Sequence, residues 1–184
     1  MRFTESDSIG VIGLGLMGSA LAERFLDSGF NVIGFDINPT RQKVLRKLGG
    51  QSLGSASEIA MACKRIVFSL PTTDVVESVI RELGATLRPG SILVDTTTGE
   101  PERTTKLGAK LARRRIRYLD ATVVGSSAQT RVGDVIVLVG GSSRTFAGCR
   151  DIFGSFAKRV FHGAKPSAFS AGESSARSRT DLFE

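Results

Sequence analysis

Residues 9–18 read Ile9-Gly10-Val11-Ile12-Gly13-Leu14-Gly15-Leu16-Met17-Gly18, and this stretch decides the fold of the 184-residue chain. An apolar, β-favouring run ends in the pattern Gly13-x-Gly15-x-x-Gly18, and a helix-forming stretch follows at once. In such a pattern the first glycine permits a tight turn, the second lets the backbone approach a pyrophosphate, and the third lets helix and strand pack closely. Phosphates then bind the free N–H groups at the helix N-terminus. The pattern predicts dinucleotide binding, with an ordinary strand–helix turn as the alternative.

A second β-favouring run, residues 31–35, ends in Asp36. An acidic residue at this place, about 20 residues beyond the glycines, can bind the hydroxyls of an adenine ribose. The alternative role for Asp36 is a turn or helix cap before Asn38-Pro39. The glycine pattern and the carboxylate together favour dinucleotide binding.

Strand-like and helix-like stretches alternate along the chain. The expected strands are residues 8–12, 31–35, 51–53, 65–70, 91–95, 117–121, 135–139 and 158–162. The expected helices are residues 16–28, 39–48 and 57–63, one capped by Thr73 or Asp74 and ending at Leu83, one from Pro101 onward, and one capped by Ser142 or Ser143 and ending at Phe153. This alternation predicts an α/β domain with a doubly wound, mostly parallel Rossmann sheet over residues 1–163. Residues 164–184, rich in Ser, Ala, Gly and Arg, are expected to form a weakly ordered tail.

Ligands of such sheets bind outside the carboxyl ends of the strands. Three polar segments are expected at those ends: Leu70-Pro71-Thr72, Asp95-Thr96-Thr97-Thr98 and Asp120-Ala121-Thr122. Their threonine hydroxyls can hydrogen-bond a nicotinamide or its ribose, and a turn or cap role is the alternative for each.

Composition narrows the class of protein. Apolar residues make up 41% and charged residues 23% of the chain, as in soluble globular domains. We expect no membrane segment and no secretory leader, since no apolar run is long enough to span a bilayer and residues 4–8 are polar. Cys63 and Cys149 match no metal or redox spacing, so we predict reduced thiols, no metal site and a cytoplasmic location.

The net charge of +7 comes from one stretch without acidic residues. Its basic residues are Arg103, Lys106, Lys110, Arg113, Arg114, Arg115 and Arg117, most of them at helical spacing. A solvated helix face is favoured over an anion-binding stripe for nucleic acid, because Tyr118 is the sole aromatic residue nearby.

Several segments, in order, resemble the β-hydroxyacid dehydrogenase family, which includes 3-hydroxyisobutyrate dehydrogenase and the N-terminal domain of 6-phosphogluconate dehydrogenase. The resembling segments are Gly13-Leu14-Gly15-Leu16-Met17-Gly18, Gly29-Phe30-Asn31-Val32, Ser69-Leu70-Pro71, Val94-Asp95-Thr96-Thr97-Thr98 with Pro101, Asp120-Ala121 and Val139-Gly140-Gly141. The resemblance implies an NAD(P)-dependent oxidoreductase that transfers hydride between the cofactor and a small β-hydroxyacid or semialdehyde. The cofactor-binding residues that we expect are Gly13, Leu14, Gly15, Leu16, Met17, Gly18, Asp36, Ile37, Leu70, Pro71, Thr72 and Thr98.

The resemblance also bears on the choice of cofactor. NADP-preferring members often carry Asn-Arg-Thr after the second strand, where this chain has Asp36-Ile37-Asn38. A carboxylate there would repel a 2′-phosphate, so we predict NAD, with NADP left open by the nearby Arg41.

The chain departs from the family in its substrate loop. The family reads Asp-Ala-Pro-Val-Ser-Gly-Gly where this chain has residues 120–126, so Val124 replaces the serine and one glycine is kept. The substrate-binding residues that we expect are Gly125, Ser126 and Ser127, with Arg131 as a further anion contact. A loop that no longer binds substrate is the alternative.

The chain also departs from the family after His162. The family's catalytic lysine would fall at Gly172, and its C-terminal helical domain has no counterpart, so we assign no catalytic residue. We expect a truncated or frame-shifted cofactor-binding domain that is inactive alone and self-associates through exposed apolar surface. The alternative is a non-catalytic NAD-binding module whose basic helix binds an acidic partner or nucleic acid.

Overall fold

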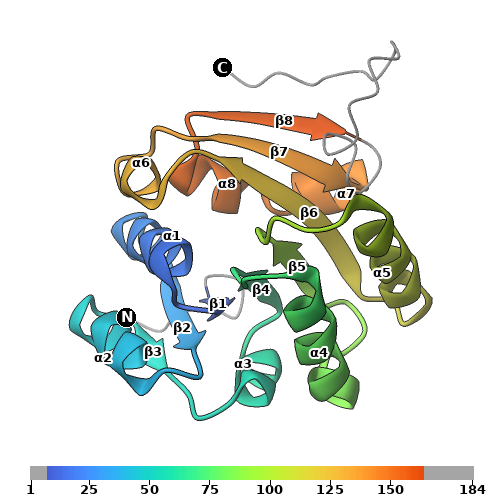
Figure 1. Ribbon diagram of the computed structural model, residues 1–184, viewed down its shortest axis with the longest axis horizontal. Helices are drawn as coiled ribbons and strands as arrows, with labels where there is room; N and C mark the ends of the chain where they lie inside the picture. The colour runs from blue at the N-terminus through green and yellow to red at the C-terminus, as the bar shows by residue number, and fades with distance from the viewer. Residues whose placement is uncertain (1–7, 164–184) are drawn as a thin grey trace.

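A computed structural model describes residues 8–163 of the chain. Within them, eight strands form one sheet in the order β3-β2-β1-β4-β5-β6-β7-β8 (Figure 1). The strands are β1 (Ser8–Ile12), β2 (Asn31–Phe35), β3 (Gln51–Ser52), β4 (Arg65–Phe68), β5 (Ile92–Asp95), β6 (Arg117–Val124), β7 (Ile136–Gly141) and β8 (Arg159–Gly163). Neighbouring strands are parallel except β6 and β7, which pair antiparallel. The predicted doubly wound, mostly parallel sheet is confirmed.

Helices cover both faces of this sheet. They are α1 (Leu16–Asp27), α2 (Pro39–Lys47), α3 (Ala56–Ala62), α4 (Thr73–Leu83), α5 (Pro101–Arg113), α6 (Ser127–Arg131), α7 (Ser143–Ala147) and α8 (Arg150–Phe156), with a 3₁₀ turn η1 (Gly84–Thr86) after α4. One core cluster lies under α1, α2, α7 and α8, and the other under α3, α4 and α5 (Figure 1). Successive strand residues alternate between the clusters, as Val11 and Ile12 of β1 do, because side chains of a strand point to opposite faces.

The strand order reverses direction at β1, which pairs with β2 on one side and with β4 on the other. The connections that leave β1 and β4 therefore diverge to opposite faces of the sheet. This divergence opens a crevice outside the carboxyl ends of the two strands, the place where ligands of doubly wound folds bind.

The helices differ from the prediction in three details. The single helix expected from Ser142 or Ser143 to Phe153 is two helices, α7 and α8, because Cys149 has a non-helical backbone (φ −130°, ψ 11°). The short helix α6 was not predicted. The cap of α4 is Thr72, whose side chain accepts from Val75 N, rather than Thr73 or Asp74.

Two predictions at β6 also need correction. Residues 120–122 lie inside this strand rather than at its end, because residues 119–124 continue to pair with β7. Asp120 is still level with Asp95, the last residue of β5, so it lies at the expected edge of the sheet. Arg117 begins β6 and does not share the face of α5.

The predicted tail, residues 164–184, lies outside the described residues. Among residues 8–163, every helix is too short or too polar to cross a bilayer.

Candidate functional site

The glycine turn after β1 is shaped by close backbone contacts. Gly13 has φ +93°, and a Cβ atom built on it would lie 2.3 Å from Ser69 O. A Cβ on Gly18 would lie 1.9 Å from Gly13 O. A Cβ on Gly15, in contrast, would have Arg41 Nη1 as its nearest neighbour, at 3.9 Å. Gly13 and Gly18 are therefore required by the turn itself, whereas Gly15 keeps open space in front of the backbone.

The N-terminus of α1 faces this open space. Its N-cap is Gly15, which has no side chain to accept a hydrogen bond, and its first turn holds no acidic residue. The helix has 12 residues, so its dipole and its free N–H groups favour an anion at this end. The turn thus provides the phosphate-binding geometry that the sequence predicts.

Asp36, at the end of β2, is buried and held by backbone donors. Leu14 N donates to Oδ2 at 2.7 Å, and Asn38 N donates to Oδ1 at 2.8 Å. Arg41 Nη1 lies 3.3 Å from Oδ2. The cap of α2 is Asn38, whose side chain accepts from Thr40 N, so capping is not the role of Asp36. Its carboxylate is fixed beside the glycine turn.

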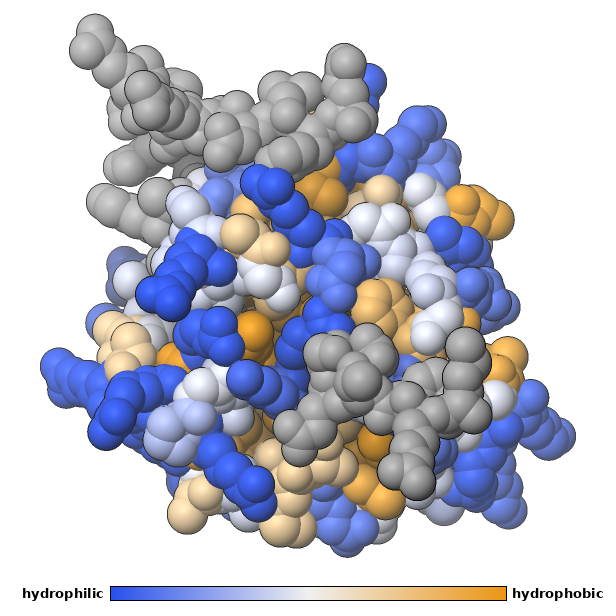
Figure 2. All heavy atoms as spheres, turned by 180° about the vertical axis from the view of Figure 1, so that it is seen from behind, coloured by the Kyte–Doolittle hydropathy of each residue, from blue (hydrophilic) through white to orange (hydrophobic). Residues whose placement is uncertain are grey.

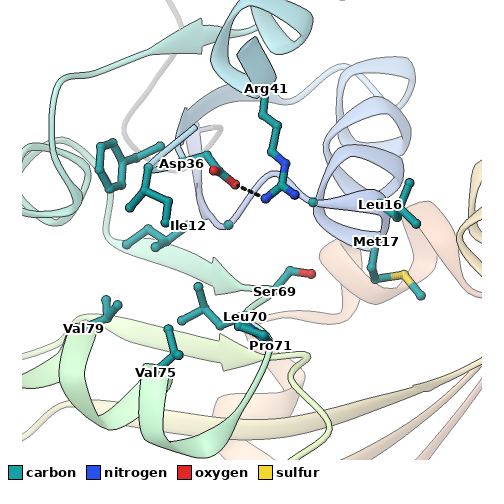
Figure 3. A pocket seen from close by; sticks show the side chains of 14 residues that line it. Ile12, Leu16, Met17, Asp36, Arg41, Ser69, Leu70, Pro71, Val75 and Val79 are labelled. Carbon is teal, nitrogen blue, oxygen red and sulfur yellow. Dashed lines mark hydrogen bonds and ion pairs between the residues drawn. The ribbon is translucent and has the colours of Figure 1, made fainter. Parts of the chain in front are cut away.

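A cavity of about 510 Å³ lies between these groups and the β4–α4 connection (Figure 3). It is lined by Ile12, Gly13, Gly15, Leu16, Met17, Phe35, Asp36, Ile37, Arg41, Ser69, Leu70, Pro71, Val75 and Val79. In Figure 3, Asp36 and Arg41 lie on one side of the cavity, and Leu70, Pro71, Val75 and Val79 lie on the other. The cavity is therefore polar at one rim and apolar along the opposite wall.

Eight of the predicted cofactor-binding residues line this cavity: Gly13, Gly15, Leu16, Met17, Asp36, Ile37, Leu70 and Pro71. Leu14 and Gly18 lie behind it, the first in the core and the second packed under Gly13. Thr72 caps α4, and Thr98 is exposed beyond β5. Their roles toward a cofactor remain predictions.

Sequence reasoning missed part of the apolar wall. Val75 and Val79 of α4 are not among the predicted cofactor-binding residues, but they line the cavity, while Val76 and Ile80 are buried beneath them. Their i, i+4 spacing places Val75 and Val79 on the same side of the helix, and this spacing was the available signal. Ser69, directly before Leu70, was also missed as a lining residue.

A buried network supports the β4–α4 connection from behind. Tyr118 OH donates to Asp95 Oδ2 at 2.7 Å, and Thr97 N donates to Asp95 Oδ1 at 3.0 Å. Thr97 Oγ1 in turn accepts from Leu70 N at 3.1 Å. Burial raises the pKa of Asp95 above its ordinary value, and the hydrogen bonds from Thr97 and Tyr118 oppose that rise. Thr97 thus positions a residue of the cavity wall.

The predicted substrate residues lie outside the cavity, after β6. Ser126 caps α6 in a reciprocal arrangement: Gln129 N donates to its hydroxyl, and the Gln129 side chain accepts from Ser126 N. Ser127 begins α6, and Gly125 precedes the cap with φ +148°. Arg131 pairs with Glu23 of α1 at 3.0 Å. The local structure already engages most of these polar groups.

Some side chains of the basic stretch, residues 103–117, also form ion pairs or hydrogen bonds within the fold. Arg103 forms ion pairs with Asp74, Glu77 and Glu100. Arg114 and Arg117 donate to backbone carbonyls, those of Gly84 and Gly90.

Other chemistry-bearing side chains are buried. His162 Nε2 lies 2.9 Å from Gly141 O, and its ring stacks on Phe146. Burial raises the pKa of the Cys63 and Cys149 thiols to about 11. Across residues 8–163, no group of three or more His, Cys, Asp or Glu residues is arranged to hold a metal.

Comparison with known families decides what this fold is. A family model described as the NAD binding domain of 6-phosphogluconate dehydrogenase matches residues 8–163. The chain belongs to this NAD-binding domain family. The resemblance to β-hydroxyacid dehydrogenases is confirmed.

Individual proteins similar to the chain extend this finding. The chain is 30% identical over 161 residues to 2-(hydroxymethyl)glutarate dehydrogenase of Eubacterium barkeri, covering 86% of this chain and 54% of that protein. The structure of Mycobacterium tuberculosis 3-hydroxyisobutyrate dehydrogenase with L-serine matches with a TM-score of 0.85 and 25% identity, covering 88% and 56%. A variant of the Myxococcus stipitatus imine reductase in complex with NAD⁺ matches with a TM-score of 0.81 and 26% identity, covering 86% and 55%. The chain spans about half the length of the curated relatives that it matches.

Proposed function

We propose that the chain binds a nicotinamide dinucleotide, with NAD preferred, in the cavity between β1 and β4. The observation that carries this proposal is the uncapped N-terminus of α1, which opens onto the cavity at Gly15. The carboxylate of Asp36 is fixed beside it. A pyrophosphate fits the free N–H groups, and the vicinal hydroxyls of a ribose fit the carboxylate.

The apolar wall supports the same assignment. Ile37 is 91% exposed and Leu16 is 79% exposed, although both side chains line the cavity. Together with Val75 and Val79, Ile37 forms a surface that an adenine ring would cover. Covering it removes apolar area from water, which favours binding by roughly 25 cal/mol for each Å².

The choice of NAD is tested with Asp36→Ala. This change removes the partner of the ribose hydroxyls and the negative charge that opposes a 2′-phosphate, so the gap between the NADH and NADPH dissociation constants should narrow by about tenfold or more. The gap is measured by fluorescence titration of the full chain with each cofactor. Asp27→Ala removes an exposed carboxylate from the far end of α1 and serves as the control. An unchanged gap in Asp36→Ala would contradict the assignment.

We propose hydride transfer only for a protein that also supplies a proton-transfer group for the substrate. In this family the bound nicotinamide would supply the hydride, while the chain's own residues hold the cofactor through the glycine turn and Asp36. Acid–base chemistry on a hydroxyacid or semialdehyde needs a proton-transfer group at the reacting oxygen, and we assign none in this chain. We therefore propose no turnover of small semialdehydes by the chain alone. Steady oxidation of NADH in their presence would contradict this.

Self-association remains a prediction. Figure 2 shows apolar residues exposed between hydrophilic ones on the face that it views. Val124, Val132 and Ile136, around the β6–β7 connection, are 51%, 74% and 36% exposed, which supports an apolar contact there. A monomer in sedimentation that also binds no hydrophobic dye would contradict it.

A binding module that uses the basic helix is the second candidate. The engagement of Arg103, Arg114 and Arg117 within the fold leaves fewer cations for an acidic partner and favours a solvated helix face. Salt-dependent DNA binding that is lost on changing Arg113, Arg114 and Arg117 would overturn this preference. The cytoplasmic location stays a prediction.

A further inference from the structure

A chain of buried hydrogen bonds joins Tyr118 of β6 to the wall of the cavity at the end of β4, two strands away. The Tyr118 hydroxyl donates to Asp95 Oδ2 at 2.7 Å, and Asp95 also bonds the side chain and the backbone N–H of Thr97. The Thr97 hydroxyl accepts from Leu70 N at 3.1 Å. Tyr118, Asp95 and Thr97 are all buried, so water does not compete for these bonds.

Leu70, at the end of this chain of bonds, touches the glycine turn as well as the cavity. Its Cδ2 atom lies 3.1 Å from the place that a Cβ on Gly13 would take. Ser69, directly before it, lies behind the same turn, because its Cβ is 3.2 Å from the place of a Cβ on Gly18. A shift of Leu70 would therefore disturb both the apolar wall and the turn proposed to bind the pyrophosphate.

The Thr97 hydroxyl holds Leu70 best in one orientation. A hydroxyl has one hydrogen to donate and two lone pairs that accept. An ionised Asp95 only accepts, so the Thr97 hydrogen points to the carboxylate and a lone pair is left for Leu70 N. A protonated Asp95 no longer orders this hydrogen, and it can itself donate to the Thr97 oxygen. The ionised form of Asp95 is thus the form that holds the wall.

Tyr118 favours that form of Asp95. Burial raises the pKa of Asp95, and the Tyr118 hydroxyl opposes this rise by donating to the ionised carboxylate. Phe68 of β4 and Asp120 of β6 are the neighbours of Asp95 in register, and Thr104 of α5 hydrogen-bonds to Tyr118. Asp120 is the titratable group among these neighbours, and its negative charge disfavours the ionised form of Asp95.

We propose that Tyr118 is a positioning residue of the cofactor site, whose hydroxyl acts through Asp95 and Thr97 to hold Leu70 in the place that a dinucleotide needs. Tyr118 itself lies outside the lining of the cavity. This inference rests on the proposed function, because it concerns what holds the wall of the same cavity.

The test is a calorimetric titration of the full chain with NAD⁺ between about pH 5 and pH 8. Tyr118→Phe keeps the ring and loses the hydroxyl, so the pKa of Asp95 should rise further. As the pH falls, the variant should therefore lose affinity at a higher pH than the unchanged protein, with a dissociation constant about fivefold higher in that window. In an Asp95→Asn background, the exchange at Tyr118 should shift nothing, which separates Asp95 from Asp120.

Exchanges of threonine test the next link. Thr97→Val removes the acceptor for Leu70 N and should raise the dissociation constant for NAD⁺ about tenfold, whereas Thr97→Ser keeps a hydroxyl and should retain the affinity. Thr145→Val is the matched control, since this buried threonine of α7 bonds Ser142 and lies outside the cavity lining. Its affinity for NAD⁺ should equal that of the unchanged protein. Unfolding curves show that each variant is folded during the titration.

The possible failures are distinguishable. An unchanged protein that binds no NAD⁺ overturns the proposed function and this inference together. Tyr118→Phe with the affinity and pH dependence of the unchanged protein overturns this inference and leaves the proposed function standing. A loss of affinity in Tyr118→Phe that is equal at every pH, or a loss in Thr145→Val as large as in Thr97→Val, also overturns it, because a general loosening of the fold would then explain the effect.

Discussion

Helices α1 and α6 pack against each other, yet their N-termini are in opposite states. The two are joined by the ion pair of Arg131 with Glu23 and by the contact of the Thr130 hydroxyl with Met17 Sδ. Each follows a strand at the same edge of the sheet. The N-terminus of α1 is an uncapped glycine that opens onto a cavity, whereas α6 begins with a complete capping box of Ser126 and Gln129.

This difference shows which of two segments predicted from a family resemblance is the better candidate for a binding site. The family resemblance predicts ligand binding at both segments, a cofactor at the glycine turn and a substrate at Gly125, Ser126 and Ser127. At the N-terminus of α1, no side chain caps the backbone N–H groups, so they are open to a ligand. At α6, the polar groups of Ser126 and Gln129 hydrogen-bond to each other. Buried and structured polar groups are normally paired, so donors that the fold leaves open are the better indication of binding.

The largest expected effect is at the glycine turn. Gly18→Ala places a methyl group 1.9 Å from Gly13 O, where backbone cannot easily move. The free energy of unfolding should fall by about 3 kcal/mol or more, and NADH binding should be lost. Gly154→Ala is the control, because its Cβ would meet nothing within 4 Å and α8 should gain about 0.5–1 kcal/mol from the exchange. Denaturant unfolding measures the free energy of unfolding of both variants. A small loss of stability in Gly18→Ala would contradict the inference that the packing of this turn requires a glycine at position 18.

A smaller effect concerns β5, which lies between the strands that lead to the two helices. The pKa of Asp95 is raised in the folded state, mainly by burial, so the folded protein holds this proton more tightly than the unfolded chain. The stability that this gives is present below about pH 4 and is lost as the pH rises through the folded-state pKa.

Asp95→Asn removes this titration. The stability of the unchanged protein relative to the variant should therefore fall as the pH rises from about 4, by about 1.4 kcal/mol for each unit by which the pKa is raised. Denaturant unfolding of both proteins at a series of pH values measures this difference. A relative gain in stability with rising pH would show that the carboxylate is stabilised rather than penalised by its surroundings.

The smallest effect is expected at α6. Ser126→Ala breaks the capping box and should cost about 1 kcal/mol of stability without changing the affinity for NADH. Ser127→Ala, one residue further on, should have little effect on either quantity. Thermal unfolding and NADH titration of the two variants separate capping from binding. A drop in NADH affinity for Ser126→Ala would mean that the two helix ends act as one site.

The sequence predicts the sheet, the glycine turn and Asp36 well because each depends on local pattern: alternating apolar runs, a glycine spacing and a strand end. The sequence does not predict the features that depend on contacts between distant segments of the chain. Residues 122–124 extend β6 because β7 pairs with them, and the break between α7 and α8 occurs inside a periodic apolar run. That Val75 and Val79 line the cavity depends on where the β4–α4 connection places α4. The pairing of Arg41 with Asp36 likewise requires the geometry of the α2 turn.

The central claim is that the open N-terminus of α1 binds a dinucleotide, and Gly15→Ala tests it most directly. Its Cβ would meet Arg41 Nη1 alone, at 3.9 Å, so the fold should keep its stability to within about 1 kcal/mol. The same methyl group would stand where the pyrophosphate approaches the backbone, so the dissociation constant for NADH should rise by about tenfold or more. The measurement is a paired NADH titration and unfolding curve for the full chain and this variant. Equal NADH affinity in the two proteins, at equal stability, would contradict the account.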